Sequence, residues 1–181
     1  MKLFVISDIH GSEKALNRAL ELFNKEKADY LIVLGDILNH APRNALPDGY
    51  SQMGVANKLN AMKDKVIALQ GNCDSEVDHE VLHFPLLPLF MVISGDKKFF
   101  FTHGHIYNAS HLPPMNPGDY LVHGHFHITW FMEKDGVYVA SPGSIAIPKG
   151  GSEAAYIIID DGKLDIKSLE TEESILEKVR K

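Results

Sequence analysis

Three histidines lie close together in the stretch LVHGHFHITW, residues 121–130, within an apolar run of this chain of 181 residues. A single histidine in such a run is usually a hydrogen-bonded neighbour of the core. Three histidines at alternate positions instead favour a metal site or a proton-transfer site. Which of these the chain builds depends on the other polar side chains that could meet them.

Polar side chains of the same kinds follow other short apolar runs. Carboxylates, imidazoles and an amide oxygen are ligands that suit divalent Mn, Fe or Zn, and no thiolate is needed. The candidate ligands are Asp8, His10, Asp36, Asn72, His103, His125 and His127. They are too many for one ion, whereas two ions that share a bridging carboxylate would use them all.

The apolar pattern of the first half predicts a βαβ unit. Residues 2–7 and 29–36 are typical of buried strands, and residues 12–27 have apolar side chains at helical spacing behind an N-cap at Ser12. Two strands joined in this way are parallel, and ligands bind at the carboxyl ends of parallel strands. The candidate ligands that follow these strands can therefore converge. The further predicted elements are a helix over 51–62, a strand over 65–70, and loops over 39–50 and 71–78.

The second half of the chain has a different pattern, in which strands are joined by short turns. The predicted elements are two strands within 89–105, a strand over 120–125, hairpins over 129–141 and 154–170, and a closing helix or frayed tail over 172–181. We therefore predict an α/β fold and a single domain over residues 1–181, with either one mixed sheet or two packed sheets.

Composition and charge narrow the function classes. Apolar residues make up 45% of the chain, which is enough for a core, and the formal net charge is -6. A protein that binds the phosphates of nucleic acid usually has a basic surface, so nucleic-acid binding is not favoured. Cys73 is the only cysteine, which excludes an intramolecular disulfide. The apolar runs are too short for a secretory signal or a membrane span, and we expect a cytoplasmic protein.

The polar blocks DIH, GD, GN, THGH and GHFH, in this order, resemble the signature of the calcineurin-like metallophosphoesterases. The stretches ISDIHGS, GDILNHAPRNALPDGY, GNCDSEVD and PGSIAIPKGG are similar to a bacterial phosphodiesterase branch of that superfamily, and the similarity covers nearly the whole chain. The resemblance implies two mixed β-sheets packed as a sandwich and flanked by helices. It also implies metal-dependent hydrolysis of a small phosphodiester substrate.

The resemblance further assigns the candidate ligands to two metal ions. One ion would take Asp8, His10, Asp36 and His127, and the other would take Asp36, Asn72, His103 and His125, with Asp36 as the bridge. Mn is the first choice of metal, with Fe, Zn, Ni and Mg as alternatives. A hydroxide that bridges the two ions would attack phosphorus in line, and the ions would offset the charge on the phosphoryl oxygens.

The chain departs from the common superfamily pattern at the proton donor to the leaving group. Many members have a histidine directly after the asparagine of the GN block, whereas this chain has Cys73. A thiol is a poor substitute for an imidazole in this role. We expect His105 or a metal-bound water to act instead, and the predicted catalytic residues are Asp36 and His105.

Four further residues have weaker assignments. Arg43 suits bidentate contact with phosphate, and an exposed loop arginine is the equal alternative. Asp74 is expected either to orient a metal ligand or to be solvated. Lys149 could contact substrate, although a plain loop is the favoured prediction, and His123 is predicted to pack beside the site without binding metal. The predicted substrate-binding residues are Arg43, Asn44 and Asn72.

Two other functions stay open at this level. A phosphomonoesterase would use the same two-metal site, and a scaffold resembling the retromer subunit of this fold would use it to bind a protein. The complete ligand set favours catalysis, and the lack of a histidine after Asn72 favours diesters with good leaving groups. A nuclease of the Mre type is disfavoured because the chain is short and acidic. A homo-oligomer is left open.

Overall fold

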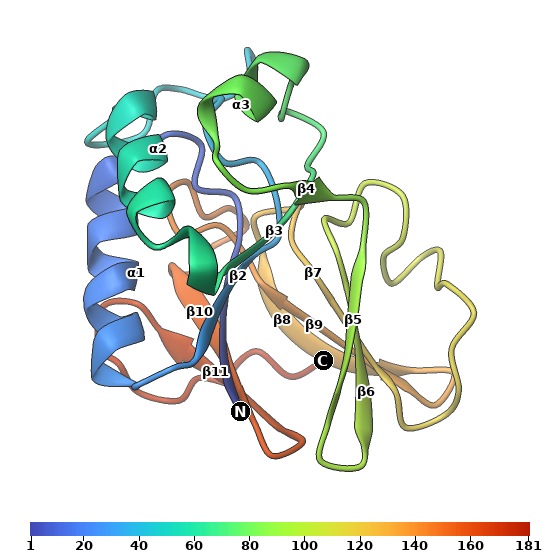
Figure 1. Ribbon diagram of the computed structural model, residues 1–181. Coiled ribbons are helices and arrows are strands. Elements are labelled where there is room, and N and C mark those ends of the chain that lie inside the picture. The colour runs from blue at the N-terminus through green and yellow to red at the C-terminus, as the bar shows by residue number, and fades with distance from the viewer.

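The computed structural model describes residues 1–181, and its strands form two sheets (Figure 1). The first sheet has the strand order β11-β10-β1-β2-β3-β4. Its strands are β1 Lys2–Ile6, β2 Tyr30–Val33, β3 Val66–Leu69, β4 Leu86–Leu87, β10 Ala155–Asp160 and β11 Lys163–Ser168. Strands β1 to β4 are parallel to one another, whereas β10 pairs antiparallel with both β1 and β11.

The second sheet has the strand order β5-β6-β7-β9-β8. Its strands are β5 Phe90–Ser94, β6 Lys97–Thr102, β7 Tyr120–His123, β8 Thr129–Lys134 and β9 Val137–Pro142. The three inner strands are parallel, and the two edge strands β5 and β8 are antiparallel to their neighbours. Both sheets are thus mixed, as the resemblance implied, and the prediction of two packed sheets is confirmed.

The two longer helices cover the outer face of the first sheet, on the left of the view, and the shortest helix lies at the top (Figure 1). They are α1 Glu13–Lys25, α2 Gln52–Ala61 and α3 Glu76–Val81, with a 3₁₀ turn at Lys63–Lys65. The Ser12 side chain caps α1 by accepting the Ala15 N–H at 3.2 Å, as the sequence predicts. None of the helices is both long and apolar enough to span a bilayer.

Strand β1 shows how the two layers of core are built. Phe4 and Ile6 face the helices, while Leu3 and Val5 face the second sheet. Because successive side chains alternate between the faces of a strand, a strand buried on both faces needs a continuous apolar run. The run KLFVI meets that requirement, and β1 lies in the interior of the first sheet.

The predicted loop over 71–78 is wrong in its second half, because α3 begins at Glu76. The Ser75 N–H donates to Asp78 Oδ2 at 3.0 Å, which is part of a capping box. The helix has only 6 residues, too few to show an apolar period. The short strand β4 was not predicted for the same reason, since it has 2 residues.

The C-terminal segment 172–181 is neither a helix nor a frayed tail. Ile175 is buried between the sheets, and the backbone near the end pairs with the edge strand β8. The Phe131 N–H donates to the Val179 carbonyl at 3.1 Å, and the Lys181 N–H donates to the Phe131 carbonyl at 2.8 Å. The segment thus satisfies unpaired groups of an edge strand, and this outweighs its local helix propensity.

Candidate active site

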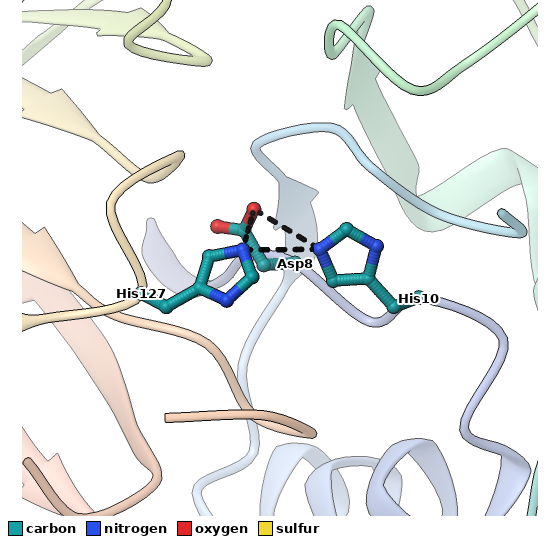
Figure 2. A group of neighbouring side chains, drawn as sticks. All are labelled: Asp8, His10 and His127. Atoms are coloured by element: carbon teal, nitrogen blue, oxygen red, sulfur yellow. Dashed lines mark hydrogen bonds and ion pairs between the residues drawn. The ribbon is translucent and has the colours of Figure 1, made fainter. Parts of the chain in front are cut away.

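The loops after β1 and β7 bring together the first group of predicted ligands, which are Asp8, His10 and His127 (Figure 2). His127 Nε2 lies 3.3 Å from Asp8 Oδ1, and His10 Nε2 lies 3.7 Å from the same oxygen. The two Nε2 atoms are 3.1 Å apart. All three side chains are buried, although 117 residues separate the two histidines.

The hydrogen bonds of this group leave its inner atoms without partners. His10 Nδ1 faces the Asn39 carbonyl at 2.6 Å, and His127 Nδ1 faces the Ile147 carbonyl at 3.1 Å. A ring nitrogen that faces a carbonyl carries the proton, so in the neutral rings both Nε2 atoms present lone pairs to each other. Asp8 Oδ1 is buried and accepts no hydrogen bond. Two lone pairs and an unpartnered carboxylate oxygen at one point fit a bound cation.

A second group lies beside the first and consists of Asp8, Asp36 and His103. His103 Nδ1 faces the Leu34 carbonyl at 2.8 Å, so its Nε2 is also free to bind a metal. That Nε2 lies 3.0 Å from Asn72 Oδ1 and 3.5 Å from Asp36 Oδ1. A nitrogen lone pair between two acceptor oxygens again fits a cation. Asp8 follows β1, Asp36 follows β2 and Asn72 follows β3.

His125 completes the predicted set from the loop after β7. Its ring centroid lies 5.1 Å from that of His103, and its backbone N–H donates to Asp8 Oδ2 at 3.0 Å. Its ring nitrogens do not belong to any of the groups whose ligand atoms all lie within 4.8 Å of one another. The structure therefore brings together all seven side chains, with His125 at the edge of the cluster.

Cys73 also lies at this cluster. Its thiol forms a group with His10 and Asp36, whose ligand atoms all lie within 4.8 Å of one another. Burial and the nearby Asp36 carboxylate raise the pKa of the thiol to about 12. Both effects favour the thiol over the thiolate at neutral pH.

The Asp8 carboxylate is ionised. Burial alone would raise its pKa, but the His10 and His127 rings beside it lower the pKa far below the ordinary value for an aspartate. The Ser7 hydroxyl also donates to Asp8 Oδ2 at 2.6 Å. The carboxylate thus holds its charge next to the two histidines.

The backbone of the ligand loops adopts a conformation that L-residues seldom use. The φ angle is positive at five of the ligands: Asp8 at 55°, His10 at 47°, Asp36 at 55°, His125 at 72° and His127 at 60°. A positive φ in a residue other than glycine costs about 1 kcal/mol or more, and such residues cluster at functional sites. This strained backbone path brings the ligand side chains together.

Asp74 holds two of the ligand loops in place. Its Oδ2 accepts the N–H of Asp36 at 2.8 Å and that of Gly71 at 2.7 Å, and its Oδ1 accepts the N–H of Ile37 at 2.7 Å. Asp74 is buried, so the sequence-based alternative of a solvated loop aspartate is wrong. The carboxylate ties the loop that carries Asp36 to the loop that carries Asn72.

A cleft of about 320 Å³ opens over the cluster. Its outer wall contains Arg43, Asn44, Phe126 and Lys149. Lys149 Nζ donates to Asn44 Oδ1 at 3.0 Å, which joins the loop after β2 to the loop after β9. Lys149 lines the cleft and contacts Asn44, so it does not lie in a plain loop away from the site, and Phe126 is an addition to the site. For Phe126, the signal in the sequence was a large apolar residue between two candidate ligands.

The remaining predicted residues lie at the rim of the site or behind it. His105 is exposed, with its ring centroid 5.4 Å from that of His103, and it does not line the cleft. His123 is fully buried behind the site and packs edge-on against Trp130, with ring centroids 5.2 Å apart. A broader depression of about 720 Å³ lies at the far end of β2 and holds no such cluster.

Comparisons with known proteins agree with this geometry. Residues 1–163 match the calcineurin-like phosphoesterase superfamily domain. Phosphodiesterase YfcE of Escherichia coli strain K12 is 46% identical over 180 residues, which are 99% of this chain and 97% of that protein. Phosphodiesterase MJ0936 of Methanocaldococcus jannaschii is 27% identical over 79% of this chain and 83% of its own length.

A solved structure extends the comparison to three dimensions. The structure of YfcE, described as a phosphoesterase from E. coli, superposes with a TM-score of 0.93 at 45% identity. The superposition covers 97% of each chain. From the matched domain and these similarities, the chain belongs to the calcineurin-like phosphoesterase superfamily.

Proposed function

We propose that this chain is a metal-dependent phosphodiesterase that works through two divalent cations. The observation that carries the proposal is the pair of ligand groups that meet at Asp8, each with its ligand atoms within 4.8 Å of one another. Membership in a phosphoesterase superfamily supports a hydrolase acting on phosphoesters. The two similar proteins described above are both named phosphodiesterases.

In this proposal each cation has four ligands from the chain. One is held by Asp8, His10, Asp36 and His127, and the other by Asp36, Asn72, His103 and His125. Two such cations lower the pKa of a water molecule and offset the charge on the phosphoryl oxygens. Mn is the proposed metal because it suits the carboxylate and amide oxygens of the set, while the imidazoles also admit Fe, Zn or Ni.

The chain's own residues orient the reaction. The bonds from His10, His103 and His127 to backbone carbonyls keep their Nε2 atoms directed into the site. Arg43 and Asn44 are the proposed contacts for oxygens of the substrate, since both line the cleft. His105 stays the proposed proton donor to the leaving group, with water as the alternative.

We also propose a small phosphodiester as the substrate and a single domain over residues 1–181. A location in the cytoplasm is consistent with a chain that has one cysteine. A homo-oligomer stays open.

The test compares bis-p-nitrophenyl phosphate, a diester, with p-nitrophenyl phosphate, a monoester. Metal-stripped protein is assayed with and without Mn²⁺, next to the variant Asp36→Asn. We expect Mn²⁺-dependent hydrolysis of the diester, and a loss of at least 100-fold, roughly 3 kcal/mol of barrier, in the variant.

Each other result points to a different function. Faster hydrolysis of the monoester would make the chain a phosphomonoesterase. No turnover of either compound, in protein shown to bind Mn²⁺, would contradict the proposed activity and favour the binding scaffold.

A further inference from the structure

Two cationic side chains on the outer wall of the cleft have no carboxylate partner. Arg43 and Lys149 both line the cleft and both are exposed. The contact of Lys149 Nζ is the neutral amide oxygen of Asn44, so the ammonium keeps its full charge for a ligand. The rest of the chain is acidic, with a formal net charge of -6. A local pair of cations in such a chain indicates an anionic ligand.

The position of Lys149 is fixed relative to the ligand cluster. Its backbone N–H donates to the His127 carbonyl at 2.8 Å, and His127 Nδ1 faces the Ile147 carbonyl at 3.1 Å. The loop that carries Lys149 is therefore tied to a proposed metal ligand at two points. The contact of its Nζ with Asn44 Oδ1 holds the charge at the wall of the cleft.

The charge of the cluster is already matched by a single phosphodiester. Two divalent cations, the carboxylates of Asp8 and Asp36, and an attacking hydroxide together leave one positive charge. A phosphodiester has one negative charge, which neutralises it. Arg43 and Lys149 are in excess of this requirement. Their charge favours a second phosphate group in the substrate, which adds one further negative charge.

Phe126 gives the cleft an aromatic surface. Its side chain is 44% exposed although it lies between two buried or half-buried histidines in the chain. The rings of His123 and His125 meet it edge-on, with centroids 5.8 and 4.9 Å from its own. Neither contact is a face-to-face stack. A large aromatic ring held by its neighbours at the wall of a polar cleft is suited to stacking on a planar group of a ligand.

We propose that the substrate is a diphosphate diester with a planar aromatic group, of the kind found in esters of nucleoside diphosphates. One phosphate lies at the cluster, the other contacts Arg43 and Lys149, and the aromatic group stacks on Phe126. This inference rests on the proposed phosphodiesterase function and names its substrate class.

The reaction on such a substrate is the hydrolysis of a phosphoanhydride. Water adds to one phosphorus, and the bond from that phosphorus to the bridging oxygen breaks. The bridging oxygen leaves with the other phosphate, and both protons of the water pass to solvent. The products are two phosphate monoesters. A phosphate monoester leaves without first being protonated, so this substrate needs no strong acid at the leaving group.

The test uses two substrates that share the same base. ADP-ribose is a diphosphate diester, and the methyl ester of AMP is a phosphodiester with adenine and a single phosphate. We expect kcat/KM of the Mn²⁺-loaded protein to be at least about tenfold higher for ADP-ribose, because its leaving group is a phosphate monoester and its second phosphate contacts Arg43 and Lys149. Equal values for the two compounds would overturn the inference.

Two variants separate the charge from the ring. Lys149→Gln should lower kcat/KM for ADP-ribose roughly tenfold more than for the methyl ester. Phe126→Leu should lower kcat/KM for both compounds by roughly fivefold or more, because both carry the base. The matched controls are Lys163→Gln on β11 and Tyr30→Leu on β2, which remove an exposed charge and an exposed ring far from the cleft. Variants that behave like their controls would overturn the inference.

A binding measurement tests the proposed substrate class without requiring turnover. The probe is the methylene-bridged analogue of ADP-ribose, and its Kd is measured by calorimetry for metal-stripped and Mn²⁺-loaded protein. We expect both variants to weaken binding in each state, by roughly fivefold or more. If bis-p-nitrophenyl phosphate is hydrolysed but the analogue does not bind, the proposed function stands and the substrate class is wrong. If nothing is hydrolysed yet the analogue binds through Phe126 and Lys149, the proposed activity fails and the class of ligand is supported.

Discussion

At the scale of single residues, the site depends on which nitrogen of each histidine ring already has a hydrogen-bond partner. His10, His103 and His127 each direct Nδ1 to a backbone carbonyl and Nε2 to the cluster. With no cation between them, the lone pairs on His10 and His127 would repel across 3.1 Å. Cation binding removes that repulsion and supplies the missing partner of Asp8 Oδ1. The arrangement is therefore complete only when charge is added to it.

The Asp74 carboxylate provides the first prediction at this scale. In Asp74→Asn the side chain keeps one acceptor oxygen for three backbone N–H groups that the aspartate now serves. At least one buried N–H loses its partner, so we expect the free energy of unfolding to fall by about 1–3 kcal/mol. Urea unfolding of the metal-stripped protein measures this loss.

Asp96→Asn is the matched control, since that side chain is 84% exposed at the turn between β5 and β6. Its unfolding free energy should stay within about 0.5 kcal/mol of the wild type. Equal stability of the two variants would mean that Asp74 does not hold the ligand loops together.

The candidate ligands could be predicted from the sequence because their residue types and their order along the chain are visible there. The contacts of Asp74 could not, since they join residues from two loops that only the fold brings together. The exposure of Phe126 at the cleft could not be predicted for a related reason. An apolar residue beside strand β7 gives no sign of its exposure until the loop conformation is known.

At the scale of elements, the strands and long helices follow from apolar periodicity, while short or paired segments do not. The βαβ unit and the hairpins have the predicted positions, with ends that differ by a few residues. Helix α3 and strand β4 are too short to show a period. The segment 172–181 has the composition of a helix but pairs with β8, and such a long-range contact is invisible to local propensity.

Helix α1 supplies a prediction about pH. Glu26 is the C-cap of this helix and accepts a hydrogen bond from Lys167 Nζ on β11 at 2.6 Å. Burial alone would raise its pKa, but Lys167 and then Lys2 lower the pKa below the ordinary 4.5. A lowered folded pKa stabilises the fold above about pH 4.5, and this stability is lost as the pH falls through the folded value.

Thermal unfolding between pH 6 and pH 3 tests this, with Glu26→Gln compared with the wild type. The variant should be less stable at pH 6 and should lose less stability below pH 4.5, because it has no carboxylate to protonate. Glu177→Gln, at an exposed ion pair, should keep the wild-type pH profile. Parallel curves for Glu26→Gln and the wild type would show that the contact to Lys167 contributes nothing.

At the scale of the whole molecule, the site joins the two sheets. Asp8, Asp36 and Asn72 follow strands of the first sheet, whereas His103 and the histidines after β7 follow strands of the second. The parallel strands of both sheets end at the same place, so ligands from the two halves of the chain meet there. Bound cations would link the halves directly and should raise the unfolding temperature of the whole chain.

The number of Mn²⁺ ions bound per chain tests the central claim most directly. Metal-stripped protein is brought to equilibrium with Mn²⁺ by dialysis, and bound metal is counted for the wild type, His127→Gln and His103→Gln, with the exposed His79→Gln as control. We predict two ions for the wild type and the control, and about one for each ligand variant, because each removes a ligand of only one ion. A wild-type chain that binds one ion or none at saturating Mn²⁺ would contradict the two-cation account.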